Sequence, residues 1–283
     1  MVPVVAALAA AARQLAAVSA TPRLDAELLM AHAGGTTREA LLLGARDAAV
    51  PPAFDALLAR RLAHEPVAYI TGTRAFWTIE LMVTPAVLIP RPDSETLIEA
   101  AIRHFGARAP RRILDLGTGS GALLLAALAE WPTASGVGVD ASAAAVAVAR
   151  ANAARLGLAA RAEIGRGDWS AGAREAWDLI LCNPPYIAAG AALPRDVAGH
   201  EPASALYAGA DGLDDYRALV PQLRLADDGV ACIEIGATQA AAVSDLCRSN
   251  GLSVAVERDL AARDRCIVAT PDRISLGIRC ETD

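Results

Sequence analysis

Short apolar runs alternate with stretches of helical periodicity from about residue 111 onward. Strands that alternate with helices along a chain build a parallel sheet with helices on both of its faces. The runs that predict parallel strands lie near residues 111–116, 135–139, 161–166, 177–182 and 229–235. Two further apolar runs, residues 253–256 and 266–269, are expected to close the sheet as an antiparallel pair. The larger part of the chain therefore predicts an α/β fold.

Residues 1 to about 65 show helical spacing instead. Thr21 and Pro22 are the residue types of a helix N-cap and of a first helical position. Gly34-Gly35 ends the helix that they open, a second helix begins near Thr37, and Pro51-Pro52 opens a third. This part of the sequence predicts a small helical domain.

Residues 68–90 lie between these two regions. Their apolar and polar side chains alternate, which predicts a β-hairpin with extended segments at residues 69–71, 76–81 and 83–89. We expect Asp93 or Ser94 to cap a helix that runs to about residue 104. The expected domain limits are a helical, substrate-docking domain over residues 1–65, a hairpin linker over 66–92, the α/β domain over 93–270 and a tail over 271–283.

Composition and charge narrow the functional classes. The 283 residues include 26 basic side chains, all of them arginine, and the formal net charge is −6. A net negative charge does not attract the phosphate backbone of a nucleic acid, so we expect no direct nucleic-acid binding. The five cysteines form no CxxC pair, and the four histidines show no metal-ligand spacing. We therefore expect a cytoplasmic protein with no metal site and no membrane segment.

The apolar run over residues 111–116 leads into a glycine-rich turn and a helix, which is the layout of a nucleoside-binding βαβ unit. Asp115 lies beside the turn. Asp140 ends the next strand, where its carboxylate can accept hydrogen bonds from two ribose hydroxyls. A carboxylate beside the turn would repel a pyrophosphate, but it suits an ammonium and a sulfonium. The pattern therefore favours S-adenosylmethionine over NAD.

The third expected strand ends in a further pair of candidate cofactor residues, Asp168 and Trp169. The carboxylate can accept the adenine amino group, and the indole can cover the ring, although a core tryptophan beside a capped turn is the structural alternative. The residues expected to bind the cofactor are Asp115, Gly117, Thr118, Gly119, Ser120, Gly121, Asp140, Asp168, Trp169 and Asn183.

Asn183-Pro184-Pro185-Tyr186 follows the fourth expected strand. Two consecutive prolines stop a strand and stiffen its exit. The Asn183 side chain and the Pro184 carbonyl can accept the two N–H bonds of a planar –NH2 group, and Tyr186 can lie flat against it. Such a site holds a neutral amide or an exocyclic amine while its nitrogen reacts. Asn183, Pro184 and Tyr186 are the candidate catalytic residues.

With these motifs the chain resembles the release-factor glutamine methyltransferase family. Matching segments lie in the family's order over about residues 20 to 270. They are Phe76-Trp77, Leu88 to Glu95, Asp115 to Gly121, Val139-Asp140, Gly167 to Trp169, Asn183 to Ile187, Glu201-Pro202, Gly209 to Leu213 and Glu234 to Gly236. The resemblance implies the class I S-adenosylmethionine-dependent methyltransferase fold, a seven-stranded, mostly parallel, doubly wound sheet with a small N-terminal helical domain.

The resemblance also implies a reaction, the transfer of a methyl group to the side-chain amide nitrogen (N5) of a glutamine. The implied substrate is the glutamine of the Gly-Gly-Gln loop in class 1 peptide chain release factors, and we expect a monomer. Residues 187–212 follow the motif with weak periodicity and predict a substrate-facing loop. The candidate substrate-binding residues are Asn183, Pro184, Pro185, Tyr186, Phe76 and Arg91.

Three alternatives remain open at this point. Adenine-N6 methyltransferases of nucleic acids share Asn-Pro-Pro-Tyr, although the acidic net charge argues against them. A sister family methylates a glutamine of a ribosomal protein, but Ile89-Pro90-Arg91-Pro92-Asp93 sides with the release-factor branch. A catalytically silent binding module would not need the intact motif together with Asp115 and Asp140. His200 departs from the family pattern, in which Phe is common at this position.

Overall fold

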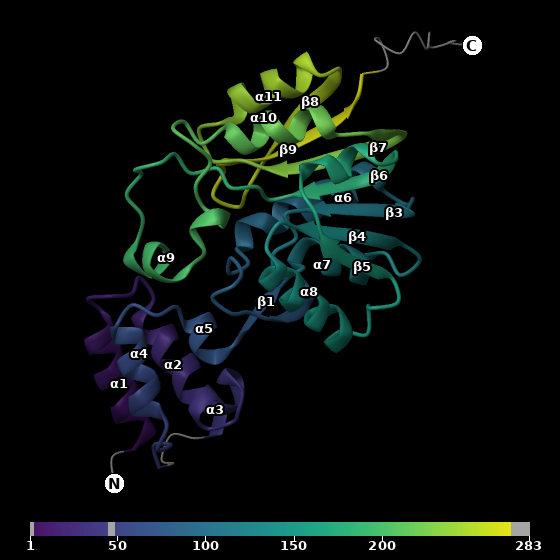
Figure 1. Ribbon diagram of the computed structural model, residues 1–283. Coiled ribbons are helices and arrows are strands. Elements are labelled where there is room, and N and C mark those ends of the chain that lie inside the picture. Colours follow the sequence, from purple (N-terminus) through teal and green to yellow (C-terminus); the bar gives the residue numbers. More distant parts are fainter. Residues whose placement is uncertain (1–2, 45–48, 273–283) are drawn as a thin grey trace. The chain divides into compact units, whose positions relative to one another are not determined.

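The computed structural model describes residues 3–44 and 49–272, and its contacts divide the chain into two compact units (Figure 1). One unit comprises Met1–Thr73 and Leu193–Glu201, and the other comprises Arg74–Ala192 and Pro202–Asp283. Most of the predicted tail, residues 273–283, lies outside the described residues. The segment 193–201 therefore packs with the N-terminal unit, although it lies far from it in sequence.

The first unit is helical. Its helices are α1 (Val4–Leu15), α2 (Pro22–Ala33), α3 (Arg38–Gly44), α4 (Phe54–Leu62), α5 (Val67–Thr71) and α9 (Arg195–His200). An apolar core that includes Leu15, Leu29 and Phe54 holds them together. Thr21 was expected to cap α2, but its hydroxyl donates to Asp25 of the same helix and makes no backbone cap.

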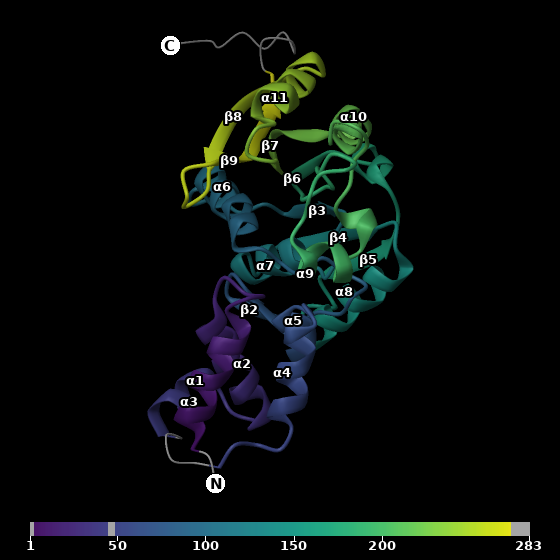
Figure 2. The ribbon, with the colours of Figure 1, turned by 90° about the vertical axis from the view of Figure 1, so that its left-hand side faces the viewer.

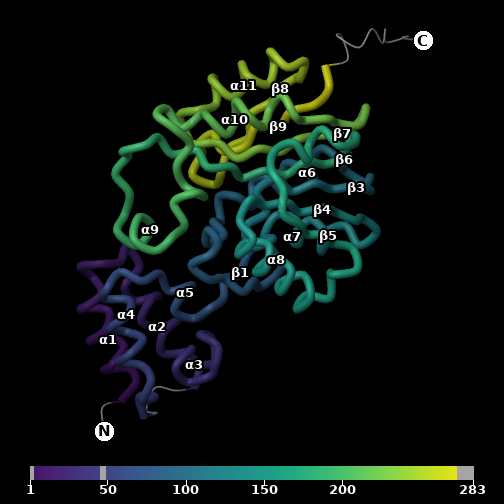
Figure 3. The backbone as a smooth tube through the Cα atoms, in the orientation of Figure 1, coloured from purple at the N-terminus to yellow at the C-terminus, as the bar shows by residue number. Residues whose placement is uncertain are grey.

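A buried ion pair joins distant parts of this unit. Arg61 Nε donates to Asp25 Oδ2 at 2.8 Å, and Arg61 lies 3.7 Å from Asp196 Oδ2 of α9. The side chains of Arg61 and Asp25 are almost fully buried, so removal of either partner would leave a buried charge unpaired. This contact holds α9 in the helical unit. Figure 3 traces the chain from β6 through residues 187–212, the segment that contains α9.

The second unit is built on a seven-stranded sheet, in the order β5-β4-β3-β6-β7-β9-β8 (Figure 2). The first five strands in sequence are parallel, and β9 runs antiparallel to β7 and β8. The strands are β3 (Arg112–Leu116), β4 (Ser135–Asp140), β5 (Ala162–Arg166), β6 (Trp177–Cys182), β7 (Leu225–Glu234), β8 (Leu252–Arg258) and β9 (Asp264–Pro271). The predicted sheet and its antiparallel closing pair are confirmed.

Helices cover both faces of the sheet, because successive strand residues point to opposite sides. Along β6, Leu179 and Leu181 belong to one apolar core, and Ile180 and Cys182 belong to the other. Residues of α6 (Glu95–Phe105), α7 (Ala122–Glu130) and α8 (Ala143–Arg155) build the first core, and α10 (Asp214–Leu219) and α11 (Ala240–Ser249) contribute to the second. The sheet is therefore doubly wound, as the fold class predicts. The short 3-10 helices are Pro92–Ser94, Trp169–Ala173, Ala203–Ala205 and Val220–Gln222.

The hairpin differs from its prediction. Residues 69–71 belong to helix α5 rather than to a strand, and the hairpin consists only of β1 (Thr73–Phe76) and β2 (Ile79–Met82). The turn between them includes Trp77 at φ +52°. Asn152 of α8 fixes the end of β2, because its amide bonds both the N–H and the C=O of Met82 as well as Ser120 O. Residues 69–71 and 83–89 were wrongly expected to be extended strands of the hairpin, because apolar residues over so short a stretch fit either period.

The expected cap of α6 is also wrong. Pro92–Ser94 forms a 3-10 turn before α6, and neither Asp93 nor Ser94 bonds the first turn of that helix. Asp93 pairs instead with Arg265 at 3.2 Å, and the Ser94 hydroxyl contacts Glu234. Both side chains therefore contact residues that are distant in sequence and do not cap α6. No helix among the described residues is long and apolar enough to cross a bilayer.

Candidate active site

A glycine turn connects β3 to α7 and lines a cavity of about 290 Å³. The N–H groups of Gly117 and Thr118 both donate to Val139 O of β4, so the turn is tied to the neighbouring strand. Gly117 has φ +72°, and a Cβ there would lie 3.3 Å from the Trp169 ring. The turn therefore needs glycine for its backbone conformation and for its close approach to the indole.

Asp115 lines this cavity and is 1% exposed. Its Oδ2 accepts hydrogen bonds from the Thr118 hydroxyl at 2.6 Å and from Leu124 N–H at 3.3 Å. Its Oδ1 is buried without a hydrogen-bond partner among the described residues. Burial raises the pKa of Asp115 to about 7. A buried carboxylate oxygen with no donor fits a cationic group, such as the ammonium of S-adenosylmethionine.

Asp140 closes the turn from the end of β4. Its Oδ2 accepts from Gly119 N–H and its Oδ1 accepts from Ser142 N–H, both at 2.9 Å. Each carboxylate oxygen keeps a second lone pair, so two ribose hydroxyls can still donate to it. The competing role, capping α8, belongs to Ser142, whose side chain accepts from Ala145 N–H. Asp140 is therefore free for the ligand role that the sequence predicts.

Trp169 and Asp168 lie in the cavity wall after β5. The Trp169 ring lies against Gly117, and its indole N–H donates to Asp215 at 3.1 Å. Asp168 Oδ1 is occupied by the N–H and hydroxyl of Ser170, which lowers the pKa of Asp168. One oxygen of Asp168 remains for an external donor. Asp215 lines the same wall, and burial raises its pKa; the sequence analysis did not identify it.

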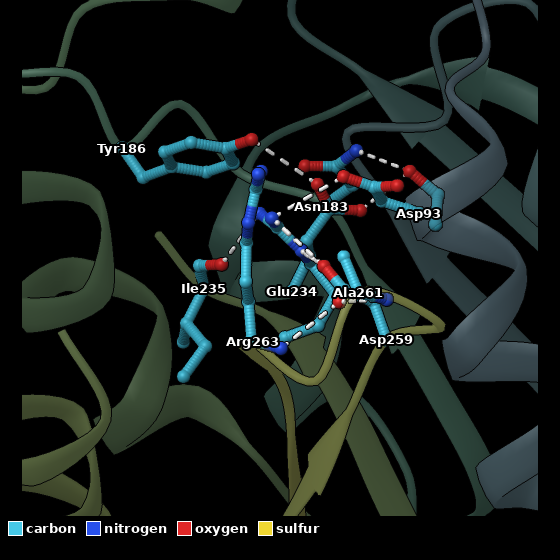
Figure 4. Close-up of polar contacts among 10 residues, drawn as sticks. Asp93, Asn183, Tyr186, Glu234, Ile235, Asp259, Ala261 and Arg263 are labelled. Atoms are coloured by element: carbon cyan, nitrogen blue, oxygen red, sulfur yellow. Dashed lines mark hydrogen bonds and ion pairs between the residues drawn. The ribbon is translucent and has the colours of Figure 1, made fainter. Parts of the chain in front are cut away.

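Asn183 follows the last residue of β6 and also lines the cavity. Its Nδ2 donates to the Ser94 hydroxyl at 3.1 Å, so its Oδ1 is the side of the amide that remains for a ligand (Figure 4). The hydroxyl of Tyr186 donates to Glu234 Oε1 at 3.2 Å. Among the described residues no hydrogen bond is made to the Pro184 carbonyl. Both oxygens thus lack a donor among the described residues, and of these two residues Asn183 lines the cavity.

The cavity brings most of the predicted site residues together. Its lining includes Phe76, Asp115, Gly117, Thr118, Gly119, Ser120, Asp140, Asp168, Trp169, Asn183 and Pro185. Gly121, Pro184, Tyr186 and Arg91 are not among the described residues that line it. Gly121 is the N-cap residue of α7 at φ +85°, and Tyr186 is half-buried. Phe76 is 1% exposed and also belongs to the apolar core beneath the hairpin. It therefore packs in this core and lines the cavity.

Two residues behind the motif were missed by the sequence analysis as site residues. Ser94 lines the cavity and Glu234 lies behind it, and both belong to segments that match the family, Leu88 to Glu95 and Glu234 to Gly236. The match of these two segments to the family was the signal that could have identified both residues. Their roles were hidden because the hydrogen bond between them spans 140 positions of the chain. Among the described residues no group of His, Cys, Asp and Glu is arranged to hold a metal ion.

Comparison with known proteins identifies the family. A family model described as the PrmC N-terminal domain matches residues 6–72, and one described as the methyltransferase small domain matches residues 94–199. The release factor glutamine methyltransferase of Rhodospirillum rubrum is 46% identical over 257 residues, covering 88% of this chain and 78% of the relative. That of Cereibacter sphaeroides is 45% identical over 272 residues, covering 93% and 96%. The chain belongs to the release factor glutamine methyltransferase family.

Solved structures support the fold of this family member. A ribosomal protein L11 methylase from Lactobacillus delbrueckii subsp. bulgaricus superposes with a TM-score of 0.50 at 20% identity, covering 68% of this chain and 84% of that one. A methyltransferase from Pyrococcus furiosus gives 0.51 at 15% identity, covering 75% and 95%. The predicted family, its methyltransferase fold and its cofactor class are confirmed by these findings.

We expect S-adenosylmethionine binding to depend on the ionisation of Asp115. Above the raised pKa of about 7 the carboxylate is charged and can hold an ammonium, and below it the group is neutral. Affinity should therefore fall as the pH decreases from 8 toward 6. Calorimetry across this range measures the effect. Asp115→Asn should bind weakly at pH 8 and lose this pH dependence; an unchanged slope in that variant would contradict the assignment.

Asp140→Ala should weaken cofactor binding by about 1–3 kcal/mol, the scale of charge-assisted hydrogen bonds. The loss has two sources, the ribose contacts and the bond to Gly119 N–H that shapes the turn. Ser142→Ala removes the neighbouring cap of α8 and should leave the affinity nearly unchanged. Equal affinity of Asp140→Ala and the unmodified protein in calorimetry would refute the ribose role.

Proposed function

We propose that this protein transfers a methyl group from S-adenosylmethionine to the side-chain amide nitrogen (N5) of the glutamine in the Gly-Gly-Gln loop of class 1 peptide chain release factors. The observation that carries the proposal is the Asn183 amide, which is anchored through Nδ2 beside the cofactor cavity and keeps Oδ1 as an acceptor. Membership in the release factor glutamine methyltransferase family supports the substrate.

The cavity residues hold the cofactor in defined roles. Asp115 would bind its ammonium, Asp140 would bind the ribose hydroxyls, Trp169 would cover the adenine, and Asp168 would accept a hydrogen bond from the adenine amino group. When bound, the cofactor would supply an electrophilic methyl group on a sulfonium, and the sulfur would leave with the electrons of the C–S bond. The protein contributes alignment and exclusion of water, which are large terms for a displacement between two held partners.

The acceptors of the motif make the amide nitrogen reactive. Its lone pair is delocalised into the carbonyl, so the nitrogen is a poor nucleophile. Asn183 Oδ1 and the Pro184 carbonyl accept its two N–H bonds, which orients the group and draws electron density onto nitrogen. When the N–C bond forms, nitrogen carries a positive charge and releases one proton to water. A general base of high pKa is therefore not required.

Tyr186 contributes a flat surface rather than a base. Burial and the neighbouring Glu234 raise its pKa well above the ordinary range, so the phenol stays protonated. Its hydroxyl is already used as a donor to Glu234, which holds the ring near Asn183 (Figure 4). The ring can then pack against the planar glutamine amide.

A direct assay separates this function from its alternatives. The protein is incubated with labelled cofactor and, in parallel, with a purified release factor, ribosomal proteins and duplex DNA, and the product is mapped by mass spectrometry. Label on the Gly-Gly-Gln glutamine supports the proposal. Label on a ribosomal protein or on adenine would replace it. The net charge of −6 disfavours nucleic acid.

The helical unit is proposed as the docking surface for the release factor. A pocket that fits one glutamine amide cannot select one glutamine among many, so specificity needs a second contact surface. The family model of the N-terminal domain ends at residue 72, close to the end of the helical unit. We further infer a monomer of the cytoplasm, and the four described cysteines are free and buried, which suits a reducing compartment.

Asn183→Ala should lower kcat about a hundredfold or more, because lost electrostatic positioning costs that much in comparable sites. Affinity for the release factor should change much less, since docking lies elsewhere. Steady-state kinetics with the intact release factor give both values, and circular dichroism checks the fold. A variant that retains more than about a tenth of the kcat would count against the role of Asn183.

A truncation that begins near Glu65 tests docking, provided that thermal unfolding shows the remaining unit to be folded. Cofactor affinity should persist, methylation of the release factor should drop sharply, and methylation of a short glutamine peptide should drop much less. The truncation also frees α9 from Arg61, so Asp196→Asn is the matched control for that contact. Equal losses for protein and peptide, beyond those of the control, would favour a stabilising lid.

A further inference from the structure

We infer that Ser94 and Glu234 are positioning residues for the methyl transfer. Glu234, acting through the Ser94 hydroxyl, holds the Asn183 amide in the one orientation that presents its carbonyl oxygen to the substrate, and it holds the Tyr186 ring at the same time. The inference rests on the proposed function, because it assigns how the acceptor of that reaction is set.

The contacts form one continuous chain behind the motif. Asn183 Nδ2 donates to Ser94 Oγ at 3.1 Å, and Ser94 Oγ donates to Glu234 Oε2 at 2.5 Å. Tyr186 donates to the other carboxylate oxygen, Oε1, at 3.2 Å. One carboxylate at the end of β7 therefore fixes two side chains of the motif that follows β6 (Figure 4).

The number of protons in this chain determines the orientation of Asn183. A serine hydroxyl has a single hydrogen, and an ionised carboxylate can only accept. The Ser94 hydrogen must therefore point at Glu234, which leaves only lone pairs facing Asn183. The side of the Asn183 amide that meets Ser94 must be its NH2 group. The carbonyl oxygen is then the group that remains for a substrate N–H.

Because Ser94 and Glu234 are buried, their hydrogen bonds determine the orientation of the Asn183 amide. Ser94 is 4% exposed and Glu234 is 1% exposed, so water does not replace a missing partner. A protonated Glu234 could donate to Ser94, whose hydrogen could then turn to Asn183. The amide would flip and present NH2 toward the NH2 group of the substrate. Two donors would face each other, and the acceptor on which the reaction depends would be lost.

Charged and titratable groups from several elements surround Glu234. Arg265 of β9 attracts it, Asp93 before α6 repels it, Tyr186 after β6 donates to it, and the Tyr216 hydroxyl of α10 donates to its backbone oxygen. Arg265 is itself paired with Asp93 and Asp259. The buried thiols Cys182 and Cys266 lie near it as well. Burial dominates this balance and raises the pKa of Glu234 to about 7.

The sign of the pH effect follows from this raised pKa. Above about pH 7 Glu234 is ionised and Asn183 presents its oxygen, and below it the protonated acid permits the flipped amide. At saturating cofactor, kcat should therefore decrease as the pH falls from 8 toward 6. Saturation separates this effect from Asp115, which acts on cofactor binding.

The test compares three variants of the full chain, Glu234→Gln, Ser94→Ala and Ser94→Thr. Glu234→Gln is isosteric but donates at one of its two contacts, and Ser94→Ala removes the relay, so each should lower kcat by about tenfold or more. Cofactor affinity by calorimetry should stay within about twofold, the level of unaffected binding. Ser94→Thr retains the hydroxyl and should recover most of the activity. Glu257→Gln, a change at a half-buried glutamate of β8 that pairs with Arg103, is the matched control.

A binding measurement adds a readout that does not depend on turnover. With S-adenosylhomocysteine present, calorimetry of a Gly-Gly-Gln peptide should show weaker binding at pH 6 than at pH 8 for the unmodified protein. Glu234→Gln should show weak binding at both values. A pH dependence that persists unchanged in Glu234→Gln would overturn the inference.

A double-mutant cycle distinguishes positioning from general stability. In an Asn183→Ala background, Ser94→Ala should cause little further loss of kcat, because its effect is exerted through Asn183. The same fold loss in both backgrounds would overturn the inference, as would normal kinetics of Ser94→Ala or Glu234→Gln. If Glu234→Gln fails to fold, the Ser94 variants decide. An unmodified protein that does not methylate a release factor refutes the proposed function instead, so the two failures are distinct.

Discussion

The parallel register of β3 with its two neighbours is the constraint on which the site depends. Leu116 of β3 lies beside Val139 of β4 on one side and Cys182 of β6 on the other. The residues that follow these two partners are Asp140 and Asn183. Since parallel strands end at the same edge of a sheet, the Asp140 carboxylate and the Asn183 side-chain amide are brought to one level of the molecule. Three segments far apart in sequence thus build one cavity.

Two buried carboxylates at this edge, those of Asp115 and Glu234, differ in how many of their oxygens accept a hydrogen bond. Burial raises the pKa of both Asp115 and Glu234 to about 7. Glu234 has a donor on each oxygen, so its charge is used within the protein to orient other groups. Asp115 keeps one oxygen without a partner among the described residues, an arrangement that costs about 1–3 kcal/mol until a ligand supplies a donor. Glu234 therefore accepts only from groups of the protein, and Asp115 Oδ1 is the oxygen that the proposed ammonium contact would use.

The sequence predicted the elements that repeat a simple period and most of the side chains that line the cavity. The strands from β3 to β9 and the glycine turn followed from apolar runs and from one residue type with a special backbone conformation. The Tyr69 segment, read as a strand, is helix α5, because apolar residues over so short a stretch fit either period. Ser94 was expected at a helix cap, and its actual partner depends on tertiary packing that no local pattern encodes.

On the proposed function, a site made of two acceptors would also limit the reaction to one methyl group. Asn183 Oδ1 and the Pro184 carbonyl offer two acceptors to a group with two N–H bonds. A hydroxyl or a carboxylate cannot satisfy both of them, which favours glutamine over glutamate. The methylated product retains a single N–H, so one acceptor would be left without a partner if it were bound again in the same way. An unmade hydrogen bond at a buried site costs about 1–3 kcal/mol, which opposes rebinding and a second transfer. On the proposed function, the orientation of the Asn183 amide would thus set both the substrate class and the extent of the reaction.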